Sequence, residues 1–152
     1  MAFELTIAAF PEGGEIPALY TCDGANLSPS IEWDGPPPHT LSFALIVDDP
    51  DAPNGTWNHW LLYDIPGHTR ALAQGAKTGT FGVSGKNDFG KLGYGGPCPP
   101  RGDGSHHYYF RLFALSTSSL GLREGENRKA LDTAMRGHVL AEASYYGLYK
   151  RG

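Results

Sequence analysis

The sequence predicts a single, mainly β domain. Its 21 glycines and 12 prolines lie along the whole chain without a repeat, so they interrupt any long helical period and indicate many turns. Between these turns stand short apolar segments of strand length. The 152 residues match the size of one ordinary domain and no linker divides them, so we expect residues 1–152 to form one unit.

The first half of the chain contains the clearest strand patterns. Residues 3–7 (FELTI) alternate apolar and polar side chains, which is typical of a half-buried strand. Residues 11–40 follow as a loop-rich region with many glycines and prolines. Residues 41–47 (LSFALIV) form a continuous apolar run, as expected for a central strand that is covered on both faces. A further strand is predicted over residues 57–65, which a Pro-Gly pair ends.

The middle of the chain is irregular. Residues 66–105 have little periodicity and many glycines, and an irregular stretch of this length is usually functional. Residues 106–115 (HHYYFRLFAL) then predict a strand that is rich in aromatic side chains.

The C-terminal region predicts two short helices and a strand. Asn127 can cap a helix over residues 128–136, and Gly137 is placed to close its last turn. A second short helix is expected at residues 138–143, and a final strand at residues 145–149.

Charge and composition exclude several function classes. The net charge is −4, and Lys and Arg form no run or stripe, which argues against nucleic-acid binding and against attraction to anionic membranes. No apolar stretch approaches transmembrane length, and the first residues lack the basic start of a secretory signal. We therefore expect a cytoplasmic protein that neither binds nucleic acid nor inserts into a membrane.

The two cysteines, Cys22 and Cys98, lack the CxxC spacings of a structural zinc site or a disulfide framework. We interpret them as two reduced thiols, which fits a reducing compartment. The alternative is a single contact or bond between the two side chains.

The first concentration of reactive side chains is the segment DPDAP at residues 49–53, followed by Trp57 and His59. Asp49 and Asp51 flank a proline at the end of a buried strand, and the prolines restrict the backbone on both sides. Rigid side chains at a strand end are typical of a functional site. The alternative is a simple turn whose carboxylates accept hydrogen bonds from local amides.

The second concentration is the segment GYGGPCPPRG at residues 93–102, followed by His106 and Tyr108. The glycines let backbone amides approach a ligand, and the prolines stiffen the loop. Amides presented in this way can form an anion-binding nest, although a Gly/Pro run is more often only a loop. Four polar side chains on two rigid loops favour a site: Asp49, Asp51, His59 and His106.

Together these motifs resemble the phosphatidylethanolamine-binding protein family, and more closely its bacterial and archaeal branch, often called Raf-kinase-inhibitor-like. The resemblance rests on DPDAP with the following Trp-x-His-Trp, and on GPCPPRGDGSHHY. It extends to the segments YTCDG (20–24), NLSP (26–29) with Trp33, NDFG (87–90) and MRGHVLA (135–141). The likeness therefore covers nearly the whole chain in order.

The resemblance implies an antiparallel β-sandwich of Greek-key type, with a large central sheet and short C-terminal helices. It also implies a ligand pocket formed by Asp49, Asp51, Trp57, His59, Pro99, His106 and Tyr108, with Cys98 on its wall. One residue departs from the family pattern, because His107 stands where the family usually has an arginine that we expect to point away from the pocket, towards an acidic partner. The family often has a cis peptide in its first motif, which makes the Ala52–Pro53 bond a candidate.

Carboxylates repel phosphate, so an anion pocket here needs a source of positive charge. Our hypothesis is that His59 and His106 supply it, because a histidine held by a carboxylate has a raised pKa and can offer its other N–H to an oxyanion. Backbone amides near Gly96–Cys98 and the hydroxyl of Tyr108 add neutral donors. An aspartate of the first motif can then meet a positive end of the same ligand, such as an ammonium group.

The predicted function is therefore binding of a small anion or phosphorylated headgroup, with modulation of a protein partner, and without a cofactor. The main alternative is an inhibitor of serine proteases or kinases whose pocket is vestigial or regulatory. A small-molecule hydrolase is a second alternative, but no activated nucleophile stands out, so we do not expect an enzyme. A metal site is not expected, because no HExxH segment or facial triad can be written. A homodimer through Tyr145, Tyr146 and Tyr149 is conceivable, although these side chains fit an ordinary strand core better.

Overall fold

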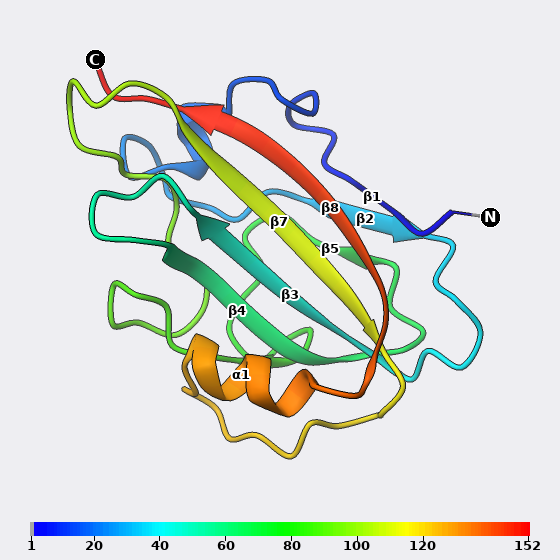
Figure 1. The fold of residues 1–152 in the computed structure, drawn as a ribbon. Helices are drawn as coiled ribbons and strands as arrows, with labels where there is room; N and C mark the ends of the chain where they lie inside the picture. Colours follow the sequence, from blue (N-terminus) through cyan, green and yellow to red (C-terminus); the bar gives the residue numbers. More distant parts are fainter. Residues whose placement is uncertain (1) are drawn as a thin grey trace.

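Two antiparallel β-sheets pack face to face in the computed structural model, which describes residues 2–152 (Figure 1). The smaller sheet has the strand order β1-β2-β5, and the larger sheet has the order β6-β4-β3-β7-β8. Their bounds are β1 (Glu4–Thr6), β2 (Ile31–Asp34), β3 (Ser42–Asp49), β4 (Trp57–Pro66), β5 (Ala71–Leu72), β6 (Val83–Ser84), β7 (His106–Leu115) and β8 (Val139–Tyr149). A 3-10 helix, η1 (Ala18–Tyr20), and an α-helix, α1 (Arg128–Met135), complete the regular structure of the described residues. The predicted β-sandwich is confirmed.

Strand β3 lies at the centre of the large sheet and is buried on both faces, as its apolar run predicts. Towards the small sheet, Phe43 packs edge-on against Trp33 of β2, with ring centroids 5.4 Å apart. Towards α1, Ala44 and Ile46 pack with Leu131. Complete burial of a side chain such as Phe43 contributes roughly 2 kcal/mol to stability. The sandwich therefore has two apolar layers, one on each side of β3.

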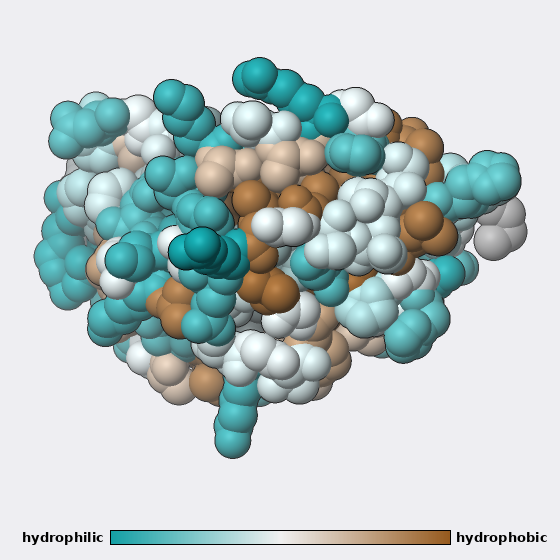
Figure 2. Space-filling view, turned by 90° about the horizontal axis from the view of Figure 1, so that it is seen from below, coloured by the Kyte–Doolittle hydropathy of each residue, from teal (hydrophilic) through white to brown (hydrophobic). Residues whose placement is uncertain are grey.

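Helix α1 covers part of the outer face of the large sheet. Asn127 caps it by accepting a hydrogen bond from the amide of Ala130 at 2.9 Å, and Gly137 follows with a φ of 81°. The first predicted C-terminal helix is thus confirmed, and it ends at Met135. Figure 2 views the molecule from below, the side on which α1 lies, and shows hydrophobic side chains gathered near the middle of that surface. No helix of the described residues is long and apolar enough to span a membrane.

The predicted second helix at residues 138–143 is wrong, because this segment is the first half of β8. The strand runs from Val139 to Tyr149 and pairs antiparallel with the whole of β7. Its inward side chains alternate as a strand requires, but they include Ala141 and Ala143, which are too small to make the period obvious in the sequence. The backbone pairing with β7 therefore overrides the local helical pattern.

Strand β4 carries an extra residue, His59, opposite β3. Val47 pairs with Trp60 and Asp48 pairs with Asn58, so no residue of β3 lies opposite His59. A bulge of this kind interrupts the alternation of side chains. His59 and Trp60 consequently both lie on the inner side of the sheet, where they contact aromatic rings.

A disulfide joins Cys22, after η1, to Cys98, before β7. The interpretation of two reduced thiols is therefore wrong, and the alternative of a bond is the one realised. The spacing of the cysteines in the sequence did not indicate this bond, because Cys22 and Cys98 are 76 residues apart and meet only in the folded chain. Their Cα atoms are 5.4 Å apart, a distance that a disulfide can bridge. Since disulfides are most common in oxidising compartments, this bond does not favour the expected cytoplasmic location, which stays a prediction.

The double substitution Cys22→Ser/Cys98→Ser is expected to lower the free energy of unfolding by roughly 2–4 kcal/mol, because the unfolded chain regains the entropy that the cross-link removes. Urea denaturation with and without dithiothreitol measures the effect. Reductant should bring the wild type close to the double variant and leave the variant unchanged. A wild-type midpoint that does not respond to reductant would contradict a stabilising disulfide.

Candidate functional site

Loops at one end of the large sheet enclose a cavity of about 190 Å³. The loop between β3 and β4 forms one side, the loop before β7 forms another, and a turn after β6 forms the third. The lining residues are Asp49, Ala52, Pro53, Trp57, His59, Phe89, Cys98, Pro99, Pro100, His106 and Tyr108. The structure thus brings all the predicted site residues to one cavity except Asp51 and Gly96.

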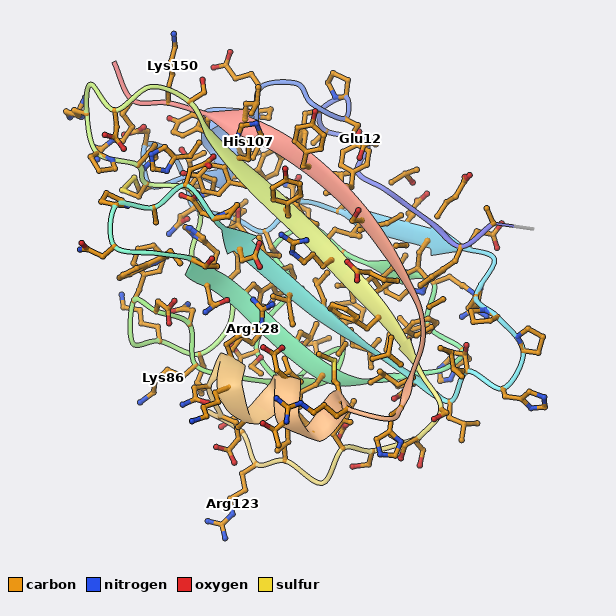
Figure 3. All side chains as sticks on the ribbon, viewed as in Figure 1. Glu12, Lys86, His107, Arg123, Arg128 and Lys150 are labelled. Carbon is orange, nitrogen blue, oxygen red and sulfur yellow. A yellow bond between two sulfur atoms is a disulfide. The ribbon has the colours of Figure 1, made fainter. Side chains whose placement is uncertain are left out.

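Two adjacent aspartates at the end of β3 face opposite sides of the sheet, because side chains alternate along a strand. Asp49 faces the cavity, where it accepts a hydrogen bond from Nδ1 of His106 at 2.6 Å. Asp48 faces α1 and pairs with Arg111 at 3.1 Å and with Arg128 at 3.0 Å. Figure 3 labels Arg128 at the end of α1 that lies against the large sheet. Both aspartates are 3% exposed, and each is paired with a cation, as the burial of a charge requires.

His106 is held between two carboxylates. Its Nδ1 donates to Asp49, and its Nε2 donates to Oδ2 of Asp103 at 2.7 Å. Since carboxylates only accept hydrogen bonds, both ring nitrogens carry a hydrogen, and His106 is a cation in this arrangement. Burial alone would lower the pKa of His106, but the hydrogen bonds to the two aspartates outweigh burial and raise the pKa.

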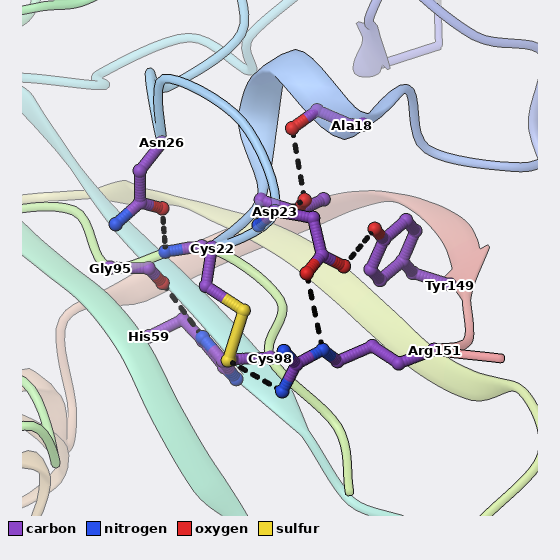
Figure 4. The surroundings of a disulfide bond; sticks show 11 residues. Ala18, Cys22, Asp23, Asn26, His59, Gly95, Cys98, Tyr149 and Arg151 are labelled. Atoms are coloured by element: carbon purple, nitrogen blue, oxygen red, sulfur yellow. Dashed lines mark hydrogen bonds and ion pairs between the residues drawn. A yellow bond between two sulfur atoms is a disulfide. The ribbon is translucent and has the colours of Figure 1, made fainter. Parts of the chain in front are cut away.

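His59 has the opposite environment (Figure 4). Its Nδ1 donates to the backbone carbonyl of Gly95 at 2.7 Å, and the amide of Gly95 donates back to the carbonyl of His59 at 2.9 Å. Burial is the main cause that lowers the pKa of His59, and the Gly95 carbonyl offsets it only in part. The expectation of a raised pKa is therefore wrong for His59. The ring is neutral near pH 7, with Nδ1 as donor and Nε2 as acceptor.

Tyr108 lines the cavity and carries a buried hydroxyl. The side chain is 1% exposed, and its hydroxyl makes no hydrogen bond within residues 2–152. Burial raises the pKa of Tyr108, and the nearby charge of Asp49 raises it further, although the two groups do not reach hydrogen-bond geometry. The ring of Tyr108 stacks on His106 and meets His59 edge-on, so the hydroxyl belongs to the same cluster.

Asp51 lies outside the cavity and organises the loop around it. Its carboxylate accepts hydrogen bonds from the backbone amide of His107 at 2.8 Å and from Nδ1 of His107 at 2.7 Å. The bond to His107 is the main cause that lowers the pKa of Asp51. Its own amide donates to Asp49 at 2.8 Å, so the turn predicted as the alternative for this motif is also present. His107 thus meets an acidic partner away from the pocket, as we expected for the arginine that it replaces.

Gly96 also lies outside the cavity wall. Its amide donates to Oδ1 of Asn26 at 2.8 Å, and a Cβ at this position would collide with the carbonyl oxygen of Tyr20. Since the amide of Gly95 is bonded to His59, neither glycine offers a free amide to a ligand. The predicted amide nest is not formed by these two residues, and Gly96 instead allows two loops to pack closely.

The disulfide and its neighbours hold the loop that carries Cys98 (Figure 4). Arg151 lies 3.6 Å from Sγ of Cys98 through Nη1, and it also pairs with Asp23 at 3.2 Å. The Ala52–Pro53 bond opposite is trans, as are the other peptide bonds of the described residues, so the cis candidate is wrong. Trans is the form that X–Pro bonds favour in most folded proteins.

The predicted site residues leave out four residues that line the cavity, namely Ala52, Pro53, Phe89 and Pro100, and they leave out Asp103, which bonds His106 without lining the cavity. Phe89 places its ring 5.4 Å from the rings of both Trp57 and His59. The segment NDFG carried the signal, because Asn87 holds this turn through its side chain, accepting from the amide of Phe89 and donating to the carbonyl of Gly93. Asp103, which bonds His106, had no comparable signal. Residues 2–152 contain no cluster of three or more His, Cys, Asp or Glu arranged to hold a metal ion.

The sequence pattern of the family described as phosphatidylethanolamine-binding protein matches residues 6–150 of this chain. A UPF0098 protein of Aquifex aeolicus is 52% identical, over 97% of this chain and 88% of that protein. A UPF0098 protein of Methanothermobacter thermautotrophicus is 48% identical, over 95% of this chain and 96% of that protein.

Solved structures agree with these matches. YbcL of Escherichia coli, described as a member of the mammalian PEBP family, superposes with a TM-score of 0.92 at 34% identity over the whole of both chains. CT736 of Chlamydia trachomatis, described as a PEBP homolog, has a TM-score of 0.92 at 39% identity over 99% of each chain. A carboxypeptidase Y inhibitor shares the fold alone, with a TM-score of 0.55 at 15% identity, over 99% of this chain and 83% of that chain. Matched in fold and along almost its whole sequence, this chain belongs to the bacterial and archaeal branch of the phosphatidylethanolamine-binding protein family.

Proposed function

We propose that the cavity binds a small phosphorylated molecule and takes its phosphate group as the singly protonated monoanion. The observation that carries the proposal is the buried hydroxyl of Tyr108, which has no hydrogen-bond partner in the described residues, on a residue that lines the cavity beside the cationic His106. A buried polar group without a partner is costly, and a ligand oxygen would remove that cost. The family description, phosphatidylethanolamine-binding, names a ligand with a phosphodiester, which shares the negative charge but has no P–OH; the free headgroup phosphorylethanolamine is a monoester and can keep one proton.

The polar groups of the cavity complement a phosphate that keeps one proton. The hydroxyl of Tyr108 can donate to an unprotonated oxygen. The cation of His106, whose two N–H groups are bonded to carboxylates, attracts the negative charge of the phosphate. The neutral ring of His59 offers a lone pair at Nε2, which suits a P–OH donor. The carboxylate of Asp49 repels a dianion more strongly than a monoanion. Phosphomonoesters lose their second proton near a pKa of about 6, so the monoanion is available around neutral pH.

The rest of the wall is apolar and limits what can accompany the phosphate. Pro53, Pro99 and Pro100 form rigid sides, and the half-exposed rings of Trp57 and Phe89 stand at the rim. Aromatic faces attract ammonium groups, so the positive end of an ethanolamine headgroup would meet these rings. This differs from the expectation that Asp49 or Asp51 meets the ammonium group, because both carboxylates are bonded to the chain itself.

Catalysis is less well supported than binding. Both nitrogens of His106 are bonded to carboxylates, so this ring has no free lone pair with which to act as a base. Cys98 is bonded to Cys22 and offers no thiolate nucleophile. Modulation of a protein partner and inhibition of a protease or kinase stay predictions, and no surface of the described residues favours them over ligand binding.

Binding is expected to weaken as the pH rises. The affinity for phosphorylethanolamine should fall roughly 50-fold from about pH 6 to about pH 8, because the monoanion fraction falls from about one half to about one hundredth. Because the pKa of His106 is raised, this cation keeps its proton to a higher pH than a free histidine does, and its loss of charge on further increase in pH weakens binding in the same direction. Isothermal titration calorimetry in buffers of matched ionic strength measures the profile.

Sulfate is the matched control ion, because it resembles phosphate in size and shape but carries no proton in this pH range. We expect sulfate to bind weakly and with little dependence on pH. Parallel titration with inorganic phosphate shows whether the headgroup itself adds affinity. Equal affinities for sulfate and phosphate, or a phosphate affinity that rises with pH, would contradict selection of the monoanion.

The substitution Tyr108→Phe is expected to weaken phosphorylethanolamine binding roughly 10-fold or more, since a hydrogen bond to a charged group is worth about 1.5–3 kcal/mol. The free energy of unfolding should not fall, because the hydroxyl has no partner in the protein. Tyr109→Phe, on the opposite face of β7, is the matched control and should leave affinity unchanged. Unaltered affinity in Tyr108→Phe would remove the main support for the proposal.

A further inference from the structure

We propose that Asp103 is an internal competitor for the ligand: its carboxylate occupies the donor nitrogen of His106, and a phosphorylated ligand binds by displacing it. The inference rests on the proposed function of the cavity. It assigns to Asp103 a role that neither the sequence motifs nor the lining of the cavity indicates, because Asp103 is not itself a lining residue.

The two carboxylates that hold His106 differ in how firmly they are fixed. Asp49 belongs to β3, its side chain is 4% exposed, and its second oxygen accepts the amide of Asp51. The side chain of Asp103 is 42% exposed, and within residues 2–152 its carboxylate bonds only to His106. Asp49 is therefore a fixed support of the imidazole ring, whereas the carboxylate of Asp103 has a single contact, although the amide of Asp103 donates to the carbonyl of Pro100 at 3.2 Å.

The backbone around Asp103 is built to move. Asp103 lies between Gly102 and Gly104, which have φ values of 79° and 81° and have no atoms crowding their Cβ positions. Residues 101–105 are all exposed. The segment is anchored before Asp103 by the hydrogen bond from the amide of Gly102 to the carbonyl of Arg151, and after it by the start of β7. A short segment between two fixed ends can swing its one carboxylate away without disturbing the sheet.

The exchange leaves the local charge balance unaltered. With Asp103 in place, the cation of His106 lies between two carboxylates. When a monoanionic phosphate replaces Asp103, the same cation lies between Asp49 and one ligand anion. If Asp103 stayed, the incoming phosphate would meet two negative groups and one positive group. Displacement is thus favoured over simple addition, and a carboxylate tethered beside His106 competes at a high effective concentration.

Removal of the competitor is expected to strengthen binding. Asp103→Ala should bind inorganic phosphate and phosphorylethanolamine roughly 10-fold more tightly than the wild type. The reason is that the bond between Asp103 and His106 no longer has to break before the ligand binds. Asp103→Asn keeps the size and the hydrogen-bond acceptor but loses the charge, so its affinity should lie between those of the wild type and Asp103→Ala. Glu124→Ala removes one exposed negative charge far from His106 and is the control for net charge, with no change expected. Calorimetry at about pH 6.5 gives the affinities, and ring ¹⁵N shifts of His106 report the exchange of its partner.

The outcomes separate this inference from the proposed function. Tighter binding in both Asp103 variants, with unchanged affinity in Glu124→Ala, supports the competitor role. If the wild type binds phosphate and the Asp103 variants bind equally or more weakly, Asp103 supports His106 and the inference is overturned while the proposed function stands. If no variant and no wild-type protein binds phosphate, the proposed function fails and the inference fails with it. Should Asp103→Ala not fold, Asp103→Asn decides alone.

Discussion

The alternation of side chains at the end of β3 is the constraint on which the rest of the structure depends. It sends Asp48 to one face of the large sheet and Asp49 to the other, and both carboxylates are buried. A buried carboxylate must be paired with a cation, because the loss of hydration is otherwise prohibitive. Asp48 and Asp49 therefore require a positive charge on each face of the large sheet. Arg111 and Arg128 meet this requirement beside α1, and His106 meets it in the cavity.

Strand β7 supplies the cations for both aspartates, because its side chains alternate between the two faces of the sheet. His106 and Tyr108 point inwards, whereas Arg111 points outwards, so a single strand supplies a cation to each aspartate. Because Asp48 also pairs with Arg128 of α1, the helix is fixed to the sheet next to the cavity. The position of His106 is thus a consequence of the sheet register and does not depend on the loops. The loop before β7 decides only which group bonds the Nε2 atom of His106, and in this structure that group is Asp103.

The sequence pattern predicted the elements whose structure depends on neighbouring residues in the chain. The aromatic run of β7 gave its bounds, 106–115, and Asn127 with Gly137 gave α1 to within one residue. The same reasoning failed where a distant segment decides the outcome: β8 is a strand because it pairs with β7, and Cys22 meets Cys98 because two loops pack together. Most of the cavity residues were predicted through the resemblance of two motifs. Neither the bulge at His59 nor the contact between Asp103 and His106 leaves a trace in composition or period.

The two histidines show why a residue list does not define a site. His59 and His106 have the same side chain and line the same cavity, yet burial lowers the pKa of His59, and the hydrogen bonds to two carboxylates raise the pKa of His106. One ring is consequently a hydrogen-bond acceptor towards the cavity, and the other is a cationic donor. A ligand that satisfies both must carry a proton and a negative charge on the same group. A protonated phosphate meets that demand, whereas a sulfate or a carboxylate supplies only the charge. The selectivity proposed for this cavity therefore comes from the difference between two environments that the fold creates in one cavity.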